Sequence, residues 1–439
     1  MNEITQTLTF TIPPEQQGQY LTVPFTMPEG IAEFRLTYAY PRFRDEAQQL
    51  PNGAFTPHDQ INIIDLGLVA PDGSQAGASG SDKTGFFING KTATPGYLPQ
   101  PLTPGEWQIL AGAYKVVPEG VTVTYQLTFI PKQRQLLLGD IHTHTVGSDG
   151  VLTLEELAAL ARKHGLDFLA ITDHNQMVSP AVLARIPDIT LIPGVEWTHY
   201  RGHANFLGLE KPYDEPFFTN TDEAMQARFQ SAHERGALIV INHPTDESCG
   251  FQFDLTKLPF DAIEIWNGPM RESNLRAVGL WHQMLAAGQK IPAVGGSDFH
   301  REKLFQILGG PCMGVYTGSD APEDILAALR AGQSFITFAP NGPTVDFSAE
   351  ETTLGGTTQW HAGLTVQVSA KKLKAGDVVR LVGASENYDL LQAPSDGEAE
   401  LTAPVPGPGF LRVEIYRSFL PGIPPLPALI SNPIYFTQS

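Results

Sequence analysis

The chain has 439 residues, 42% of them hydrophobic, and a net charge of −19 from 28 basic and 47 acidic side chains. A chain of this length is expected to form roughly two or three domains, and its acidic balance disfavours an extended nucleic-acid surface. It has two cysteines, no apolar run long enough for a membrane helix and no basic region followed by an apolar leader, so we expect a cytoplasmic protein without a disulfide framework.

Residues 1–133 contain runs of alternating apolar and polar residues separated by Gly and Pro, such as LTFTIP, FRLTYAY and VTVTYQLTFIP. A period of two is typical of antiparallel strands. Glycines and prolines also cluster between Gly73 and Gly105, which predicts long loops. We therefore predict an N-terminal all-β, sandwich-like domain over 1–133.

Residues 134–338 alternate short β-rich runs with helical patterns such as LTLEELAALARKHG and PEDILAALRAGQ. Thr153 and Glu156 have the spacing of a capping box before the first helix, and Gly165 is suited to end it. Strand–helix alternation is typical of a parallel sheet or barrel. Residues 340–439 return to strands and turns, as in LTVQVSA and FLRVEIYRS, and predict a C-terminal β-sandwich-like domain.

Potential metal ligands gather where the predicted strands of the middle segment begin or end. About seven strand-like runs are found there, and most stop at a histidine, an acid or an asparagine. In α/β barrels the loops after the strand ends form one active face, so residues distant in sequence can converge. The candidate ligands are His142, His144, Asp149, His174, Glu196, His203, His243, Asp298 and His300.

Each motif also has a structural interpretation. Residues i and i+2 of an extended segment point to the same side, so His142 and His144 can reach one cation, although a pair of loop histidines is the alternative. Taken alone, Asp173 and Asn175 in the motif Thr172-Asp173-His174-Asn175 fit a helix cap or turn better than a metal site. Glu196 at a buried strand end costs several kcal/mol unless it is paired, and a place between two cations would offset that cost.

The nine positions together favour a metal centre over nine separate structural roles. Histidine, Asp and Glu suit zinc, manganese or iron(II). A structural zinc site usually contains cysteine, and we expect Cys249 and Cys312 to be ordinary small residues rather than ligands.

The middle segment resembles the PHP superfamily, named for polymerase and histidinol phosphatase. The motifs that carry the resemblance are, in chain order, His142-x-His144, Asp149, Thr172-Asp173-His174-Asn175, Glu196, His203, Asn242-His243-Pro244 and Asp298-x-His300. The resemblance implies an α/β chain in which a distorted (β/α)7 barrel over 134–338 is flanked by the two all-β domains. Stretches outside the barrel, including IIDLGLVAPDG, GASGSDKTGFFI and ISNPIYF, are similar to the branch typified by carbaryl hydrolases.

The resemblance also implies two or three divalent ions of zinc, manganese or iron. The first position would use His142, His144, Glu196 and Asp298. The second would share Glu196 and add His203 and His243, and a third would use Asp149, His174 and His300. Family members often have histidine where Asp149 stands, and an oxygen ligand there would favour manganese or iron over zinc.

Such a ligand set predicts a metal-dependent hydrolase in which a metal-bridging hydroxide attacks phosphorus or an acyl carbon. The ions would stabilise the oxygen on which negative charge grows, and Asp298 or His300 would pass a proton to the leaving group. Arg271, Arg301 and Asn267 are candidate substrate-binding residues, and Lys303 is a further cation beside the last motif.

Three functions remain open at this point. The first is phosphoesterase activity on a small phosphorylated metabolite. The second is hydrolysis of a carbamate or aryl ester, which an apolar pocket lined by Trp197, Tyr200, Trp266 and Phe299 would favour. The third is a non-enzymatic metal-containing binding protein that contacts a polymer through Tyr97 and Trp107. We expect a small-molecule ester substrate and no nucleic-acid or membrane partner, and make no prediction of oligomeric state.

Overall fold

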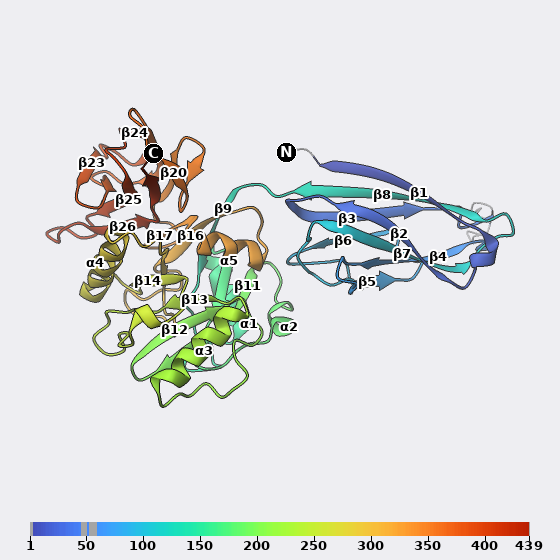
Figure 1. Ribbon diagram of the computed structural model, residues 1–439, viewed down its shortest axis with the longest axis horizontal. Helices are drawn as coiled ribbons and strands as arrows, with labels where there is room; N and C mark the ends of the chain where they lie inside the picture. Colours follow the sequence, from blue (N-terminus) through green and yellow to red (C-terminus); the bar gives the residue numbers. More distant parts are fainter. Residues whose placement is uncertain (1–2, 45–50, 52–58, 439) are drawn as a thin grey trace. The chain divides into compact units, whose positions relative to one another are not determined.

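The fold is described by a computed structural model for residues 3–44, 51 and 59–438. The chain forms two compact units, Met1–Arg134 and Gln135–Ser439, both drawn in Figure 1. The first is built from strands, and the second combines strands and helices, so the chain as a whole is a mixed α/β protein. Within the described ranges, no helix is both long and apolar enough to cross a membrane.

The first unit consists, over its described residues, of two four-stranded antiparallel sheets, ordered β1-β8-β3-β6 and β2-β7-β4-β5. Its strands are β1 (Ile4–Ile12), β2 (Tyr20–Met27), β3 (Ile31–Ala39), β4 (Ile63–Val69), β5 (Gln75–Ser79), β6 (Gly85–Asn89), β7 (Gly105–Lys115) and β8 (Val121–Pro131), with a 3₁₀ turn at Pro14–Gln16. Alternate side chains of both sheets enter one shared core. Tyr97 and Trp107 belong to that core, so the expectation that they contact a polymer is wrong.

The α/β part of the second unit contains the predicted strand–helix alternation. Its strands are β9 (Gln135–Asp140), β10 (Phe168–Ile171), β11 (Thr190–His199), β12 (Gly202–Leu207), β13 (Leu238–Ile241), β14 (Ala262–Asn267), β15 (Ala293–Gly296), β16 (Cys312–Thr317) and β17 (Ser334–Thr337). Its helices are α1 (Leu154–His164), α2 (Pro180–Leu183), α3 (Asp222–Glu234), α4 (Glu272–Ala286) and α5 (Pro322–Arg330), with a 3₁₀ turn at Leu255–Lys257.

Helix α1 has the ends that its sequence predicts. Thr153 accepts a hydrogen bond from the backbone N–H of Glu156, and the Glu156 side chain accepts one from the backbone of Thr153. Gly165 ends the helix at φ 79°, a left-handed conformation that favours glycine. The helix buries Leu157, Ala158 and Ala161 and contacts β10, which fixes the loop between β9 and α1.

The sheet of this part follows the order β15-β14-β13-β12-β11-β10-β9-β16-β17. Neighbouring strands are parallel except around β12 and β16, which run antiparallel to both of their neighbours. The sequence predicts a parallel sheet or barrel. Strand β12 departs from parallel pairing because only two residues join it to β11, too few for a crossover connection. The reversal brings the beginning of β12, which carries His203, to the edge where the parallel strands end.

The C-terminal strands continue this sheet and add a second layer. They are β18 (Thr344–Ala349), β19 (Thr352–Thr353), β20 (Thr357–Gln359), β21 (Thr365–Leu373), β22 (Val378–Val382), β23 (Asn387–Gln392), β24 (Gly397–Pro404), β25 (Gly409–Arg417), β26 (Leu426–Ser431) and β27 (Ile434–Thr437). Strand β26 pairs with β17, so the α/β sheet runs on through β25 and β22. The sheet β19-β18-β21-β24 shares a core with these strands.

Candidate metal centre

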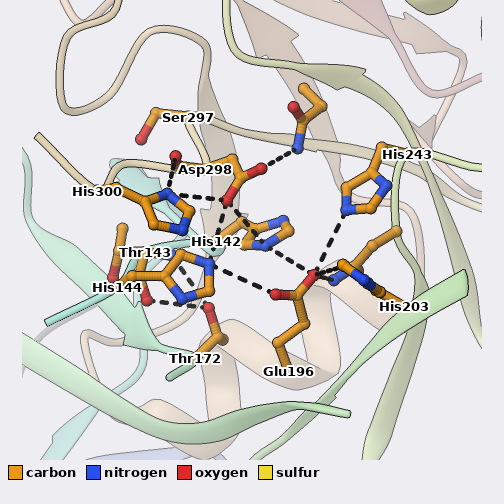
Figure 2. Close-up of polar contacts among 12 residues, drawn as sticks. His142, Thr143, His144, Thr172, Glu196, His203, His243, Ser297, Asp298 and His300 are labelled. Atoms are coloured by element: carbon orange, nitrogen blue, oxygen red, sulfur yellow. Dashed lines mark hydrogen bonds and ion pairs between the residues drawn. The ribbon is translucent and has the colours of Figure 1, made fainter. Parts of the chain in front are cut away.

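The predicted ligands converge although they come from separate strands, and Figure 2 shows all of them except Asp149 and His174. The loop after β9 supplies His142, His144 and Asp149, β10 is followed by His174, β11 contains Glu196, β12 contains His203, β13 is followed by His243, and β15 is followed by Asp298 and His300. Three overlapping groups of these side chains place their ligand atoms within 4.8 Å of one another, and a fourth joins His203 and His243 to Cys249. One edge of the sheet therefore carries a single cluster of imidazoles and carboxylates.

The innermost group surrounds Glu196, whose side chain is 1% exposed. His142 Nε2 lies 3.2 Å from Glu196 Oε1 and 3.4 Å from Asp298 Oδ1. His144 Nε2 lies 3.1 Å from the same Asp298 oxygen and 3.5 Å from Glu196 Oε2. Yet both Nε2 atoms and Glu196 Oε2 form no hydrogen bond of acceptable geometry among the described residues, even though His174 Nδ1 also lies 2.8 Å from Glu196 Oε2. Buried polar atoms that face one another without a hydrogen bond are costly, and a cation between them would satisfy them all.

A second group lies on the other side of Glu196. His203 Nδ1 is 3.1 Å and His243 Nε2 is 3.4 Å from Glu196 Oε1. Asn242 donates a hydrogen bond of 2.8 Å to the same oxygen and another of 2.9 Å to Asn205, which orients the carboxylate. Glu196 thus has imidazole nitrogens close to both of its carboxylate oxygens.

The third group lies nearer to solvent. His174 Nε2 and His300 Nε2 are 3.5 and 3.1 Å from Asp149 Oδ1, and the ring of His144 stacks 4.1 Å from that of His300. Asp149 is 60% exposed, whereas His174 and His300 are about a quarter exposed at 26% and 23%. This group also has a metal-binding donor set, with less protein around it.

Charge coupling within the cluster is strong. Burial alone would raise the pKa of Glu196, but His142, His174 and His203 hold it well below its usual value. Burial would lower the pKa of His142, and the surrounding carboxylates raise it well above its usual value instead. Burial lowers the pKa of His144. The donor set and its orphaned atoms therefore fit divalent cations, which would replace protons as the counter-charge.

Behind the ligands, Glu264 of β14 links two of them. Its Oε1 lies 3.0 Å from His142 Nδ1, and its Oε2 accepts hydrogen bonds from the His243 backbone N–H and from Asn267 Nδ2. In a regular strand, residues 264 and 267 would point to opposite faces. A bulge between Glu264 and Trp266 shifts the register and lets both reach the cluster.

A second buried carboxylate, Asp140, ties the β9 loop to the β15 loop. It accepts hydrogen bonds from the backbone N–H groups of His142, Ser297 and Gly309 and from the Ser297 hydroxyl. Burial raises its pKa to about 6. Gly296 packs against His142 so tightly that a Cβ on Gly296 would lie 2.5 Å from His142 Cβ. The two ligand-bearing loops are therefore held against each other.

Backbone strain also concentrates at the cluster. His243, Asp298 and Asn175 have φ values of 28°, 51° and 54°, in the left-handed region that residues other than glycine rarely adopt. Such conformations persist where surrounding contacts hold them, and they are common at functional sites.

The predicted substrate-binding residues differ in placement. Arg271 donates a hydrogen bond to Asn267 Oδ1, and Asn267 Nδ2 donates one of 3.3 Å to Asp298 Oδ2. Arg271 is half-exposed and also lies 3.2 Å from Asp246. Arg301 and Lys303 are exposed on the loop after His300. Arg271 and Asn267 are therefore connected to the cluster, whereas Arg301 and Lys303 share only its loop.

The aromatic residues proposed to line an apolar pocket do not line one. Trp197, Trp266 and Phe299 are 0–2% exposed core residues, and Tyr200 is 98% exposed. These side chains pack the sheet or face solvent, so the expectation of an aromatic pocket built from them is wrong.

Among the residues that contact the ligands, sequence reasoning missed Glu264, Asp140 and Cys249. Glu264 had a signal, because an acid inside the apolar run AIEIWN must find a buried partner. Asp140 ends the run QLLLGD and had a similar signal. Cys249 was expected to be an ordinary small residue, yet its sulfur lies 3.6 Å from His243 Nδ1.

Comparison with known proteins identifies the segment that carries most of the ligands. Residues 140–246 match the model of the PHP domain family. A 107-residue segment, 22% of this chain, is 36% identical to a 5'-3' exoribonuclease Rnm of Salmonella typhimurium strain LT2. The match spans 36% of that relative, about a third of its length. The chain therefore contains a PHP domain, and the predicted resemblance is confirmed.

Solved structures give a weaker likeness. One is a two-domain protein of Bacteroides vulgatus that contains a predicted PHP-like metal-dependent phosphoesterase. It is 17% identical to this chain with a TM-score of 0.40, and the match covers 64% of this chain and 90% of that protein. Another is an amidohydrolase of Chromobacterium violaceum, which is 16% identical with a TM-score of 0.27. That match covers 37% of this chain and 87% of the amidohydrolase. Likeness at this level supports no conclusion about substrate.

Proposed function

We propose that this PHP-domain enzyme is a metal-dependent phosphoesterase that acts on a small phosphorylated compound. The observation that carries the proposal is the convergence of buried imidazoles and carboxylates around Glu196, with three buried polar atoms that form no well-aligned hydrogen bond within the described part of the chain. Closed structural sites usually hold one ion in four protein ligands. A larger set of donors at a sheet edge, partly open to solvent, is better suited to catalysis than to structure.

The donor groups suggest which residues would hold the ions. His142, His144, Glu196 and Asp298 would hold one, Glu196, His203 and His243 a second, and Asp149, His174 and His300 a third. When bound, the ions would lower the pKa of a water molecule and offset the charge that develops on the reacting group. Zinc, manganese and iron(II) all suit these ligands, and the oxygen of Asp149 favours manganese or iron at the third position.

The protein's own residues would bind and orient the phosphate. Arg271 reaches Asp298 through Asn267, so its guanidinium is held at the edge of the cluster where a phosphate oxygen would lie. A guanidinium recognises phosphate oxygens through directed N–H donors. His300, whose side chain is 23% exposed, is one candidate to pass a proton to the leaving group, and Asp298 is the other.

We also propose a finer architecture for the chain. The strand order from β15 to β9 and the flanking helices support the distorted (β/α)7 barrel of the PHP superfamily over 134–338. Residues 1–133 and 340–439 would be its N-terminal and C-terminal β-sandwich-like domains. This division assigns all proposed ligands to the barrel.

The substrate class rests on two arguments. The 36%-identical relative is named as an exoribonuclease, whose bond is a phosphodiester, and this favours phosphorus over an acyl carbon as the centre attacked. It also makes a nucleotide or a short RNA end a substrate to test, despite the net charge of −19. Hydrolysis of a carbamate or aryl ester has less support, because Trp197, Trp266 and Phe299 are buried in the core.

A substrate panel tests the proposal. Metal-loaded protein is assayed with p-nitrophenyl phosphate, nucleoside monophosphates, a 5'-phosphorylated oligoribonucleotide, p-nitrophenyl acetate and 1-naphthyl methylcarbamate, each with manganese, zinc or iron(II). We expect turnover of at least one phosphate ester and its loss in the double variant His142→Ala, His144→Ala. Hydrolysis confined to the acetate or carbamate under every metal would overturn it.

A further inference from the structure

The imidazole of His243 has a partner at each ring nitrogen. Nε2 faces Glu196 Oε1 at 3.4 Å, inside the metal cluster. Nδ1 faces the sulfur of Cys249 at 3.6 Å, on the opposite side of the ring. His243 is 6% exposed, so water has little access to either nitrogen. The thiol therefore occupies the place where metal-binding histidines usually have a carboxylate, a backbone carbonyl or a water molecule.

This arrangement selects one tautomer of His243 when a cation is bound. A neutral imidazole that binds a metal through Nε2 carries its proton on Nδ1. The Nδ1–H then needs an acceptor, and the Cys249 sulfur is at hydrogen-bond distance for one. In turn, the Cys249 thiol donates to Asp246 Oδ1 at 3.5 Å. The thiol thus serves as acceptor and donor at once, with no proton left without a partner.

The loop that carries Cys249 is fixed independently of the metal ligands. Asp246 Oδ1 accepts hydrogen bonds from the backbone N–H and hydroxyl of Ser248 and from the backbone N–H of Cys249. Asp246 N–H donates to the carbonyl of His243, and Gly250 N–H donates to that of Asp246. The sulfur is therefore held against His243 by the backbone of its own loop.

Direct binding of a cation by Cys249 is the competing possibility. His203, His243 and Cys249 do offer three ligand atoms within 4.8 Å of one another. However, the nitrogen of His243 that faces the carboxylates is Nε2, and the one that faces sulfur is Nδ1. A cation shared with Glu196 would lie on the far side of the ring from the thiol. His142 Nε2 approaches the same Glu196 oxygen at 3.2 Å, so the metal cluster lies on the Nε2 side of His243.

We propose that Cys249 is a positioning residue for His243, whose sulfur accepts the Nδ1–H hydrogen bond and keeps Nε2 directed at the cation beside Glu196. The inference rests on the metal centre of the proposed function, but its test measures metal binding rather than hydrolysis. The same loop positions Arg271, because Asp246 Oδ2 lies 3.2 Å from its guanidinium. One hydrogen-bonded loop would thus set both an ion ligand and a phosphate ligand.

Metal titrations of the full-length protein test the assignment. The protein is stripped with a chelator and titrated with Zn²⁺ or Co²⁺, and bound ions are counted by elemental analysis. Cys249→Ala should bind one ion roughly tenfold more weakly, the lower end of the effect of such partners because sulfur is a weak acceptor. Cys249→Ser should recover part of that loss, since a hydroxyl can accept the same hydrogen bond. Cys312→Ala, which removes the other cysteine, is the matched control and should bind as wild type does.

The spectrum of the Co²⁺-loaded wild type distinguishes positioning from ligation and requires no variant. A thiolate bound to Co²⁺ gives an intense charge-transfer band in the near ultraviolet, and we expect none. Such a band, or wild-type ion affinity in both Cys249 variants, would overturn the positioning role while leaving the proposed function intact. Failure of the wild type to bind any ion would overturn both.

Discussion

Replacing Glu264 by Gln tests how the protein prepares His142 for a cation. Both oxygens of the Glu264 carboxylate accept hydrogen bonds. Oε1 accepts from His142 Nδ1 at 3.0 Å, and Oε2 accepts from the backbone N–H of His243 and from Asn267 Nδ2. An amide of the same shape has one acceptor and one donor end. Its oxygen is expected to keep the two donors on the Oε2 side, so its NH₂ group would face His142 Nδ1. That contact favours the tautomer with hydrogen on Nε2, the nitrogen that the ion needs.

The size of the effect follows from the bond that is lost. A hydrogen bond to a charged group contributes about 1.5–3 kcal/mol, and about 1.4 kcal/mol changes an equilibrium constant tenfold. Glu264 is 2% exposed, so water cannot take over the role of its carboxylate. We therefore expect Glu264→Gln to weaken binding of the ion held by His142 roughly 10- to 100-fold, the range found for partners behind metal-binding histidines.

Competition against a chelator of known affinity, followed by elemental analysis, measures this change. Glu272→Gln is the matched control, because it makes the same chemical change on α4 at a side chain that is 81% exposed and pairs only with Arg276 in the described contacts. Activity of Glu264→Gln should return towards wild type at high metal concentration. Wild-type metal affinity in this variant would refute the tautomer argument.

Three further outcomes are expected. Arg271→Ala should raise the KM for a phosphate ester roughly 10- to 100-fold in steady-state kinetics, because a charge-assisted contact with the phosphate is lost. Turnover of p-nitrophenyl acetate, which has no phosphate, would reveal any general loss of active protein. Acidification from about pH 7.5 to about pH 5.5 should release bound ions, because an imidazole binds a cation only when it is unprotonated. Equilibrium dialysis at the two pH values measures the number of ions lost. Thr153→Ala should lower the free energy of unfolding by about 1 kcal/mol, because the N-terminal cap of α1 is lost. Denaturant titration measures this change, and activity should stay the same.

Local features of the fold were predictable, and features set by distant contacts were not. The ends of α1 follow from Thr153, Glu156 and Gly165, because capping depends on residues a few positions apart. The direction of β12 does not follow from its own sequence, since an apolar run pairs equally well in either direction. Only its two-residue connection to β11 pointed to an antiparallel pair.

The residues of the metal centre likewise fall into those that the sequence predicts and those that depend on distant contacts. The ligands were recognisable because each follows or lies within an apolar strand, and strands of one sheet expose their ends at a common edge. Cys249 was not recognisable, because its contact with His243 depends on how the loop between them closes through Asp246. Asn267 was recognised as a strand end, but its contact with Glu264 depends on a bulge that has no signature in the sequence.

Burial divides the proposed ion positions into two kinds. His142, His144 and Glu196 are at most 1% exposed, and without a cation three of their atoms, the two Nε2 nitrogens and Glu196 Oε2, have neither water nor a well-formed hydrogen bond among the described residues. Asp149, at 60% exposure, can be hydrated whether or not an ion is bound. The protein therefore gains much more from filling the inner positions than from filling the outer one. Chelation should accordingly remove the outer ion first, and a preparation with two ions per chain would hold them on either side of Glu196.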